Sequence, residues 1–108
     1  QPVAILSGSM SPTFNRGDAV VIRKLTTGEK GQLKKKDIIH YTSGSKYVAH
    51  RIVDMTNDEN GNKLFITKGD HNNANDVDPV SYDQVIGKVT FSIPYIGYPA
   101  VWLSGLIS

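Results

Sequence analysis

A serine-rich stretch near the start of the chain carries the first candidate for chemistry. Residues 6–18 read LSGSMSPTFNRGD, and Ser9 lies between Gly8 and Met10. Glycine tolerates positive φ and proline fixes its own φ, so this composition predicts a bend rather than a helix. A serine in a turn is by default a solvated residue, but a hydroxyl held on a bend can project into a cleft as a nucleophile. Such a serine needs a base, and the base needs a group that orients it.

Three histidines are candidate bases for this serine. His40 follows two isoleucines in a short strand, His71 lies in a polar loop, and His50 lies in the run YVAHRIV. Strand alternation places His50 on one face with Val48 and Ile52. A histidine on an apolar face is more often a core residue than a catalyst. Burial also favours the neutral imidazole that accepts a proton, so His50 fits both interpretations.

A polar loop with the sequence KGDHNNANDVDP holds the candidate carboxylates Asp70, Asp76 and Asp78. Their spacing does not match the alternating ligands of a calcium loop, and Asn and Asp are common turn formers. We therefore expect no metal site, with a site built from His50, His71 and these aspartates as the alternative. One aspartate could instead accept a hydrogen bond from a histidine ring and fix its tautomer.

The composition limits the classes of function. The chain has 108 residues, no cysteine and a formal net charge of +2. This length suits one domain with one core. The absence of cysteine excludes thiol catalysis, Cys-ligated zinc and disulfides, and the small charge does not indicate a nucleic-acid partner. The basic run at residues 34–36 is expected to be a solvated loop, with contact to anionic lipid as the alternative.

Short β-branched runs separated by turns predict an all-β fold. Turns are expected at 42–45 and at 58–62, which contains an Asn-Gly pair, and residues 26–36 are expected to form a surface loop. Gly87 is a candidate bulge, and no stretch has a helical period. Strands of about five residues at intervals of about ten predict an antiparallel sandwich or small barrel. The expected strands are residues 1–6, 19–23, 37–41, 47–55, 64–67 and 84–93.

The end of the chain is apolar. Residues 89–108 contain no charged side chain, and prolines and glycines make them a poor membrane helix. This composition is typical of a strand followed by a segment at a membrane interface, and an ordinary core strand with a hydrophobic end is the alternative.

The chain contains three separated motifs: SGSMSP at 7–12 with RGD at 16–18, His50-Arg51, and KGD at 68–70 with Asn72, Asn73 and Asp76. Together these motifs resemble the type I signal peptidases. The common bacterial branch of that family has a lysine immediately before the arginine of the second motif. This chain has His50 there, which is similar to the endoplasmic-reticulum branch of eukaryotes, archaea and some spore-forming Gram-positive bacteria. His71 is a departure, because the family often has Asn at that position.

The resemblance implies a role for each matched residue. Ser9 is the nucleophile, and His50 is the general base. Asp76 is the third member of the triad and Asp70 is a supporting carboxylate that holds the loop, although the two roles could be exchanged. The Ser7 hydroxyl and the Ser9 N–H form the oxyanion hole. The implied fold is mainly β, with antiparallel sheets in the small coiled barrel or sandwich of signal peptidases and repressor-type proteases.

The implied activity is that of a serine endopeptidase that removes signal peptides from exported preproteins through an acyl-enzyme, without a cofactor. We expect the substrate to bind as an added, extended strand, with Met10 and Pro12 lining its cleft. Because family members have a transmembrane helix before the first strand, we expect residues 1–108 to be one catalytic domain. That domain is expected on the extracytoplasmic or lumenal face of a membrane, next to the lipid surface, and the need for partner subunits stays open.

Two other functions stay open at this point. A self-cleaving repressor-type protease has the same fold but uses Ser-Lys chemistry, and both His50 and the absence of an obvious internal Ala-Gly cleavage site argue against it. A non-catalytic β-barrel binding module would use Ser9 and His50 only as structural residues. The distance between the Ser9 hydroxyl and the His50 ring discriminates between a binding module and a peptidase.

Overall fold

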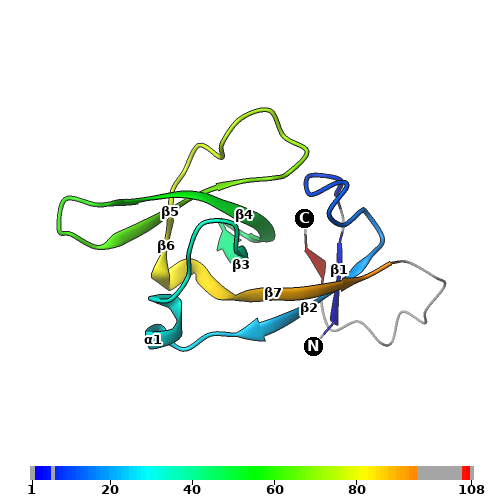
Figure 1. Ribbon diagram of the computed structural model, residues 1–108, viewed down its shortest axis with the longest axis horizontal. Helices are drawn as coiled ribbons and strands as arrows, with labels where there is room; N and C mark the ends of the chain where they lie inside the picture. The colour runs from blue at the N-terminus through cyan, green and yellow to red at the C-terminus, as the bar shows by residue number, and fades with distance from the viewer. Residues whose placement is uncertain (1, 6, 95–105, 108) are drawn as a thin grey trace.

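The computed structural model describes residues 2–5, 7–94 and 106–107. Within these residues the strands form one sheet in the order β6-β5-β4-β3-β7-β2-β1-β8 (Figure 1). Neighbouring strands are antiparallel except β1 and β8, which are parallel. The predicted, mainly antiparallel β fold is confirmed, and its strands belong to one continuous sheet. The strands are β1 (Pro2–Ile5), β2 (Ala19–Lys24), β3 (Ile38–Ser43), β4 (Lys46–Asn57), β5 (Lys63–Lys68), β6 (Val80–Ser81), β7 (Val85–Ile93) and β8 (Leu106–Ile107).

The buried apolar side chains form two clusters, and β4 contributes to both. Ala49 packs in the first cluster and Ile52 in the second, while Val48 packs against the second. This is the alternation expected for an extended strand, and it confirms that Val48 and Ile52 share a face. The first cluster is Val3, Ile5, Met10, Phe14, Val20, Ala49 and Val89; the second is Leu33, Ile39, Tyr41, Ile52, Phe65, Val80 and Val85.

Two short helical turns differ from the prediction of an all-β chain. The helix α1 (Thr27–Lys30) lies where a loop was expected, and the 3-10 turn η1 (Tyr82–Gln84) precedes β7. A capping box begins α1, because Glu29 N–H donates to Thr26 Oγ1 and Thr26 N–H donates to Glu29 Oε1. One helical turn is too short to produce a period in the sequence, but the Thr-x-x-Glu spacing is a local signal for it.

Gly87 lies beside a register shift between β3 and β7, where His40 pairs with Gly87 and Tyr41 pairs with Val85. The predicted irregularity at this glycine is therefore confirmed. A Cβ at position 87 would lie 2.6 Å from the backbone oxygen of Arg23, so the close approach of β2 also requires glycine here.

The apolar end of the chain falls largely at residues 95–105 and 108, outside the described residues. The prediction of an interfacial segment there stays a prediction. In the part of the chain that the structure describes, no helix has the length and apolar character needed to cross a bilayer.

Candidate active site

The serine-rich stretch forms the predicted bend after β1, and the core holds it in place. Ser11 N–H donates to the carbonyl of Gly8 at 3.0 Å, and Phe14 N–H donates to the carbonyl of Met10 at 3.3 Å. The side chains of Met10 and Phe14 are buried in the first cluster. Ser9 is therefore presented, half-buried, on a bend that packing fixes from beneath.

The loop that follows β5 is tied directly to this bend. His71 N–H donates to the carbonyl of Ser9 at 2.9 Å, and Asp70 N–H contacts the sulfur of Met10 at 3.3 Å. A Cβ at Gly69 would lie only 2.5 Å from the Ser9 carbonyl oxygen, so only glycine allows the two backbones to approach this closely. Sequence segments about sixty positions apart thus form one rigid junction.

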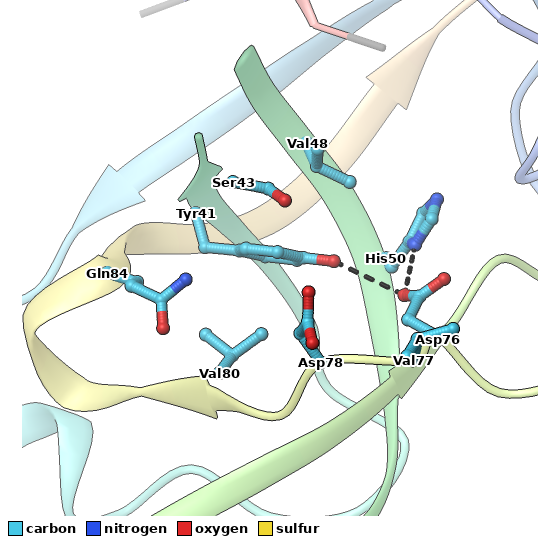
Figure 2. Close-up of a pocket in the computed structure, with 9 residues that line it drawn as sticks. All are labelled: Tyr41, Ser43, Val48, His50, Asp76, Val77, Asp78, Val80 and Gln84. Carbon is cyan, nitrogen blue, oxygen red and sulfur yellow. Dashed lines mark hydrogen bonds and ion pairs between the residues drawn. The ribbon is translucent and has the colours of Figure 1, made fainter. Parts of the chain in front are cut away.

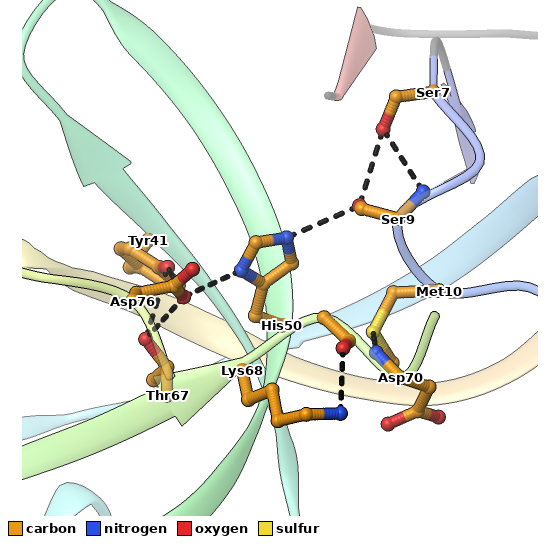
Figure 3. A network of polar contacts seen from close by, with 10 residues as sticks. Ser7, Ser9, Met10, Tyr41, His50, Thr67, Lys68, Asp70 and Asp76 are labelled. Carbon is orange, nitrogen blue, oxygen red and sulfur yellow. Dashed lines mark hydrogen bonds and ion pairs between the residues drawn. The ribbon is translucent and has the colours of Figure 1, made fainter. Parts of the chain in front are cut away.

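His50, on β4, connects the serine to a carboxylate (Figure 3). Its Nε2 atom lies 3.1 Å from Ser9 Oγ, and its Nδ1 atom lies 2.6 Å from Asp76 Oδ2. An ionised carboxylate can only accept, so the Nδ1–H donates to Asp76 and leaves the Nε2 lone pair to accept the Ser9 hydroxyl proton. The arrangement can remove a proton from Ser9 as that oxygen attacks an electrophile.

Ser7 lies next to the nucleophile candidate. Its hydroxyl is 3.1 Å from Ser9 Oγ, and it accepts a hydrogen bond from Ser9 N–H at 3.4 Å. The structure therefore brings together the two groups expected to form an oxyanion hole, the Ser7 hydroxyl and the Ser9 amide.

Asp70 has a different partner from Asp76. Its two carboxylate oxygens accept from Arg51 Nε at 2.9 Å and from Arg51 Nη2 at 2.8 Å, and Thr13 Oγ1 also donates to it. The Arg51 hydrogen bonds hold the pKa of Asp70 below its usual range. Arg51 also donates to the carbonyl of Lys36 at 2.7 Å. In this structure Asp76 contacts the histidine, whereas Asp70 ties the loop to β4.

This chain has relatives among proteins of known name, although no family model matches it. It is 41% identical over 93 residues to signal peptidase I W of Bacillus subtilis, with 84% of this chain and 47% of the relative covered. It is 35% identical over 112 residues to the signal peptidase complex catalytic subunit SEC11 of Eremothecium gossypii, and 32% identical over 114 residues to that of Lachancea thermotolerans. In both of these comparisons the match covers 94% of this chain and 65% of the relative.

The chain is a homologue of the endoplasmic-reticulum type signal peptidases. The resemblance inferred from the three motifs is thereby confirmed. The chain spans from about half to just under two thirds of the length of these relatives.

Two residues that contact Asp76, Thr67 and Tyr41, were not predicted from the sequence. Thr67 Oγ1 donates to Asp76 Oδ2 at 2.8 Å, and Tyr41 OH lies 3.3 Å from the same oxygen. Asp76 N–H also donates to the carbonyl of Thr67 at 2.8 Å. Burial raises the pKa of Tyr41 to about 12, so its hydroxyl keeps its proton at neutral pH. The position of Thr67, directly before the KGD motif, is the one signal that could have singled it out.

The remaining predicted residues occupy different environments in this signal peptidase homologue. Met10 is only 1% exposed and belongs to the first cluster, so the structure gives its side chain a packing role. Pro12 is exposed on the bend. Lining of a substrate cleft stays a prediction for both.

His71 is exposed in the loop, and among the described residues no group of three or more His, Asp or Glu side chains could hold a metal ion.

A cavity of about 190 Å³ lies beside the carboxylate end of the hydrogen-bonded chain Ser9–His50–Asp76 (Figure 2). Asp76, His50 and Tyr41 line it, but Ser9 does not. The cavity therefore borders Asp76 and His50 and does not reach Ser9. Its other lining residues are Ser43, Val48, Val77, Asp78, Val80 and Gln84.

Proposed function

We propose that residues 1–108 are the catalytic domain of a serine endopeptidase that removes signal peptides from exported preproteins. The observation that carries this proposal is the hydrogen-bonded chain from Ser9 through His50 to Asp76, in a chain homologous to signal peptidases. Ser9 is the nucleophile, His50 the general base and Asp76 the group that orients it. Asp70 accepts from Arg51 on β4 and from Thr13 on the bend, and so holds the loop in place.

The proposed reaction proceeds through an acyl-enzyme. His50 Nε2 takes the Ser9 proton as Oγ attacks the scissile carbonyl, and Asp76 stabilises the imidazolium that forms. The imidazolium then gives this proton to the leaving amine as the peptide bond breaks. A water molecule attacks the ester with the same assistance from His50, which releases the signal peptide and restores Ser9.

The proposed oxyanion hole consists of the Ser9 amide and the Ser7 hydroxyl. Both would donate to the carbonyl oxygen as it becomes negatively charged, the Ser7 hydroxyl turning away from Ser9 Oγ. Loss of one such donor typically slows a reaction by about 100-fold or more.

The proposed substrate is an extended segment of a preprotein. Main-chain pairing to a strand requires no particular side chains, and shallow pockets would select small residues before the cleaved bond. We place Met10 and Pro12 at this cleft. We further propose that the domain is anchored to a membrane and acts on its extracytoplasmic or lumenal face, next to the lipid surface.

The geometry favours this function over the self-cleaving alternative. That chemistry needs a lysine as the base, and Lys68, which directly precedes Gly69, donates to the carbonyl of Gly69 at 3.2 Å (Figure 3). The base contacting Ser9 is His50.

Cleavage of a preprotein with a known signal peptide, in detergent micelles, tests the proposal. Ser9→Ala and His50→Ala should each lower kcat by about 10⁴-fold or more, as for other serine peptidases. Ser11→Ala, in the same bend, should cleave at the wild-type rate. Comparable cleavage by Ser9→Ala and the wild type, with matching circular dichroism spectra, would refute a nucleophilic Ser9.

A further inference from the structure

One carboxylate oxygen in the site receives hydrogen bonds from three strands. Asp76 Oδ2 lies 2.6 Å from His50 Nδ1 on β4, 2.8 Å from Thr67 Oγ1 on β5 and 3.3 Å from Tyr41 OH on β3. Figure 3 shows the three side chains converging on that oxygen. The triad as usually defined needs only the histidine contact, so the two hydroxyls are additional.

The available protons determine which group donates in each hydrogen bond around Asp76. Thr67 has one hydroxyl proton, and an ionised carboxylate cannot donate, so this proton goes to Asp76. Tyr41 OH lies 3.2 Å from Thr67 Oγ1, within reach of both the threonine and the carboxylate. The hydrogen bonds therefore run from Tyr41 and Thr67 into Asp76, on the side of the carboxylate away from Ser9.

The burial of the donors differs from that of the acceptor. Thr67 is 0% exposed and Tyr41 is 4% exposed, whereas the Asp76 side chain is 26% exposed. The bond from Asp76 N–H to the Thr67 carbonyl fixes the backbone but leaves the side-chain torsions free. Without the hydroxyls, the carboxylate could turn toward water and weaken its bond to His50.

We propose that Thr67, supported by Tyr41, is a positioning residue that holds Asp76 Oδ2 against His50 Nδ1 during catalysis. This inference rests on the proposed function. In the part of the chain that the structure describes, neither hydroxyl forms a hydrogen bond with Ser9 or the His50 ring, so each hydroxyl acts on the base through Asp76. Thr67 has the larger effect, because its bond to Oδ2 is shorter and its hydroxyl is fully buried. Tyr41 borders the cavity, where water can replace part of its hydrogen bond.

Three variants separate the hydroxyl from the shape of these side chains. Thr67→Val removes the hydroxyl and keeps the shape, Thr67→Ser keeps the hydroxyl and removes a methyl group, and Tyr41→Phe removes only the phenolic oxygen. Thr67→Val should lower kcat by about 10- to 100-fold with KM unchanged, the range expected for a hydrogen bond to a charged group. Thr67→Ser should stay within about threefold of the wild type. Tyr41→Phe should fall between them.

Thr90→Val is the matched control, since Thr90 Oγ1 donates to the carbonyl of Val21 at 3.0 Å on another part of the sheet. It should leave kcat and KM unchanged. A wild-type kcat in Thr67→Val would overturn the proposal. So would a Thr67→Ser variant as slow as Thr67→Val, because the methyl group rather than the hydroxyl would then matter.

A measurement that needs no activity distinguishes failure of this inference from failure of the proposed function. Proton NMR of the protein without substrate should give a downfield Nδ1–H signal for His50 in the wild type and in Thr67→Ser. In Thr67→Val this signal should move and broaden by exchange with water. If neither the wild type nor any variant cleaves preprotein, the proposed function fails, but the NMR comparison still tests whether Thr67 positions Asp76. An identical His50 signal in all variants would overturn it.

Discussion

His50 Nδ1 lies 2.6 Å from Asp76 Oδ2, although the two residues are 26 positions apart in the sequence. The register of β4 and β5 creates this contact. Ile52 pairs with Thr67, which places Thr67 on the face of β4 that also carries His50. Asp76 N–H then bonds to the Thr67 carbonyl and brings its carboxylate to the ring.

The two aspartates should differ in their effect on activity. Asp76→Asn should lower kcat by about 10⁴-fold, because the amide can favour the wrong tautomer of His50. Asp70→Asn should lower kcat much less, since its partner is Arg51. Single-turnover cleavage of a preprotein by both variants checks this. Equal losses in the two variants would contradict the division of roles.

Acid stability should depend on Asp70. The hydrogen bonds from Arg51 lower the pKa of the Asp70 carboxyl. In the folded state this carboxyl therefore stays ionised at a pH where the same group in the unfolded chain, with an ordinary pKa of about 3.9, takes up a proton. The resulting stability is complete above about pH 4 and is lost as the pH falls through the folded pKa. Urea denaturation between pH 5 and 3 should show a shallower loss in Asp70→Asn than in the wild type. The exposed Asp83→Asn should behave like the wild type, and equal slopes for Asp70→Asn and the wild type would contradict the prediction.

Gly69→Ala should damage both stability and activity. The added Cβ would lie 2.5 Å from the Ser9 carbonyl oxygen and 3.1 Å from Ser9 Cβ, so the bend that carries the nucleophile has to move. We expect a loss of about 2 kcal/mol in the free energy of unfolding, typical of strain or overpacking in a fixed backbone. Gly28→Ala, where nothing lies within 4 Å of the new Cβ, is the control. Thermal denaturation and cleavage rates measure the effect, and a neutral Gly69→Ala would show that the junction is not rigid.

His40 should destabilise the fold at mildly acidic pH. It is 9% exposed, and among the described residues neither of its ring nitrogens has a hydrogen-bond partner. Burial lowers its pKa, so the unfolded chain takes up a proton first, and stability declines as the pH falls below about 6.5 toward the folded pKa. His40→Leu should remove this decline and raise stability by about 1 kcal/mol at neutral pH, because an unpaired buried polar group is lost. Denaturant melts at pH 5 and 7.5 test this, and an unchanged pH dependence would refute it.

Local patterns predicted most of the strands, because alternation and turn residues act over a few positions. The run around His50 and the Asn-Gly turn before β5 are examples. The helix α1 was missed because one turn has no period, and the pairing of β8 with β1 was missed because it joins the two ends of the chain. A short apolar strand contains no information about its partner.

The sequence by itself determined which chemical groups are available: a serine on a bend, a histidine in a strand, and aspartates in one loop. It could not decide which aspartate meets the histidine, because spacing along a loop does not report direction in space. The tertiary structure decided this through the pleat of β4. Arg51 and His50 are neighbours on opposite faces, so Asp70 meets the first and Asp76 the second. The same packing brought Thr67 and Tyr41 onto Asp76 from two other strands, a convergence that depends on sheet register.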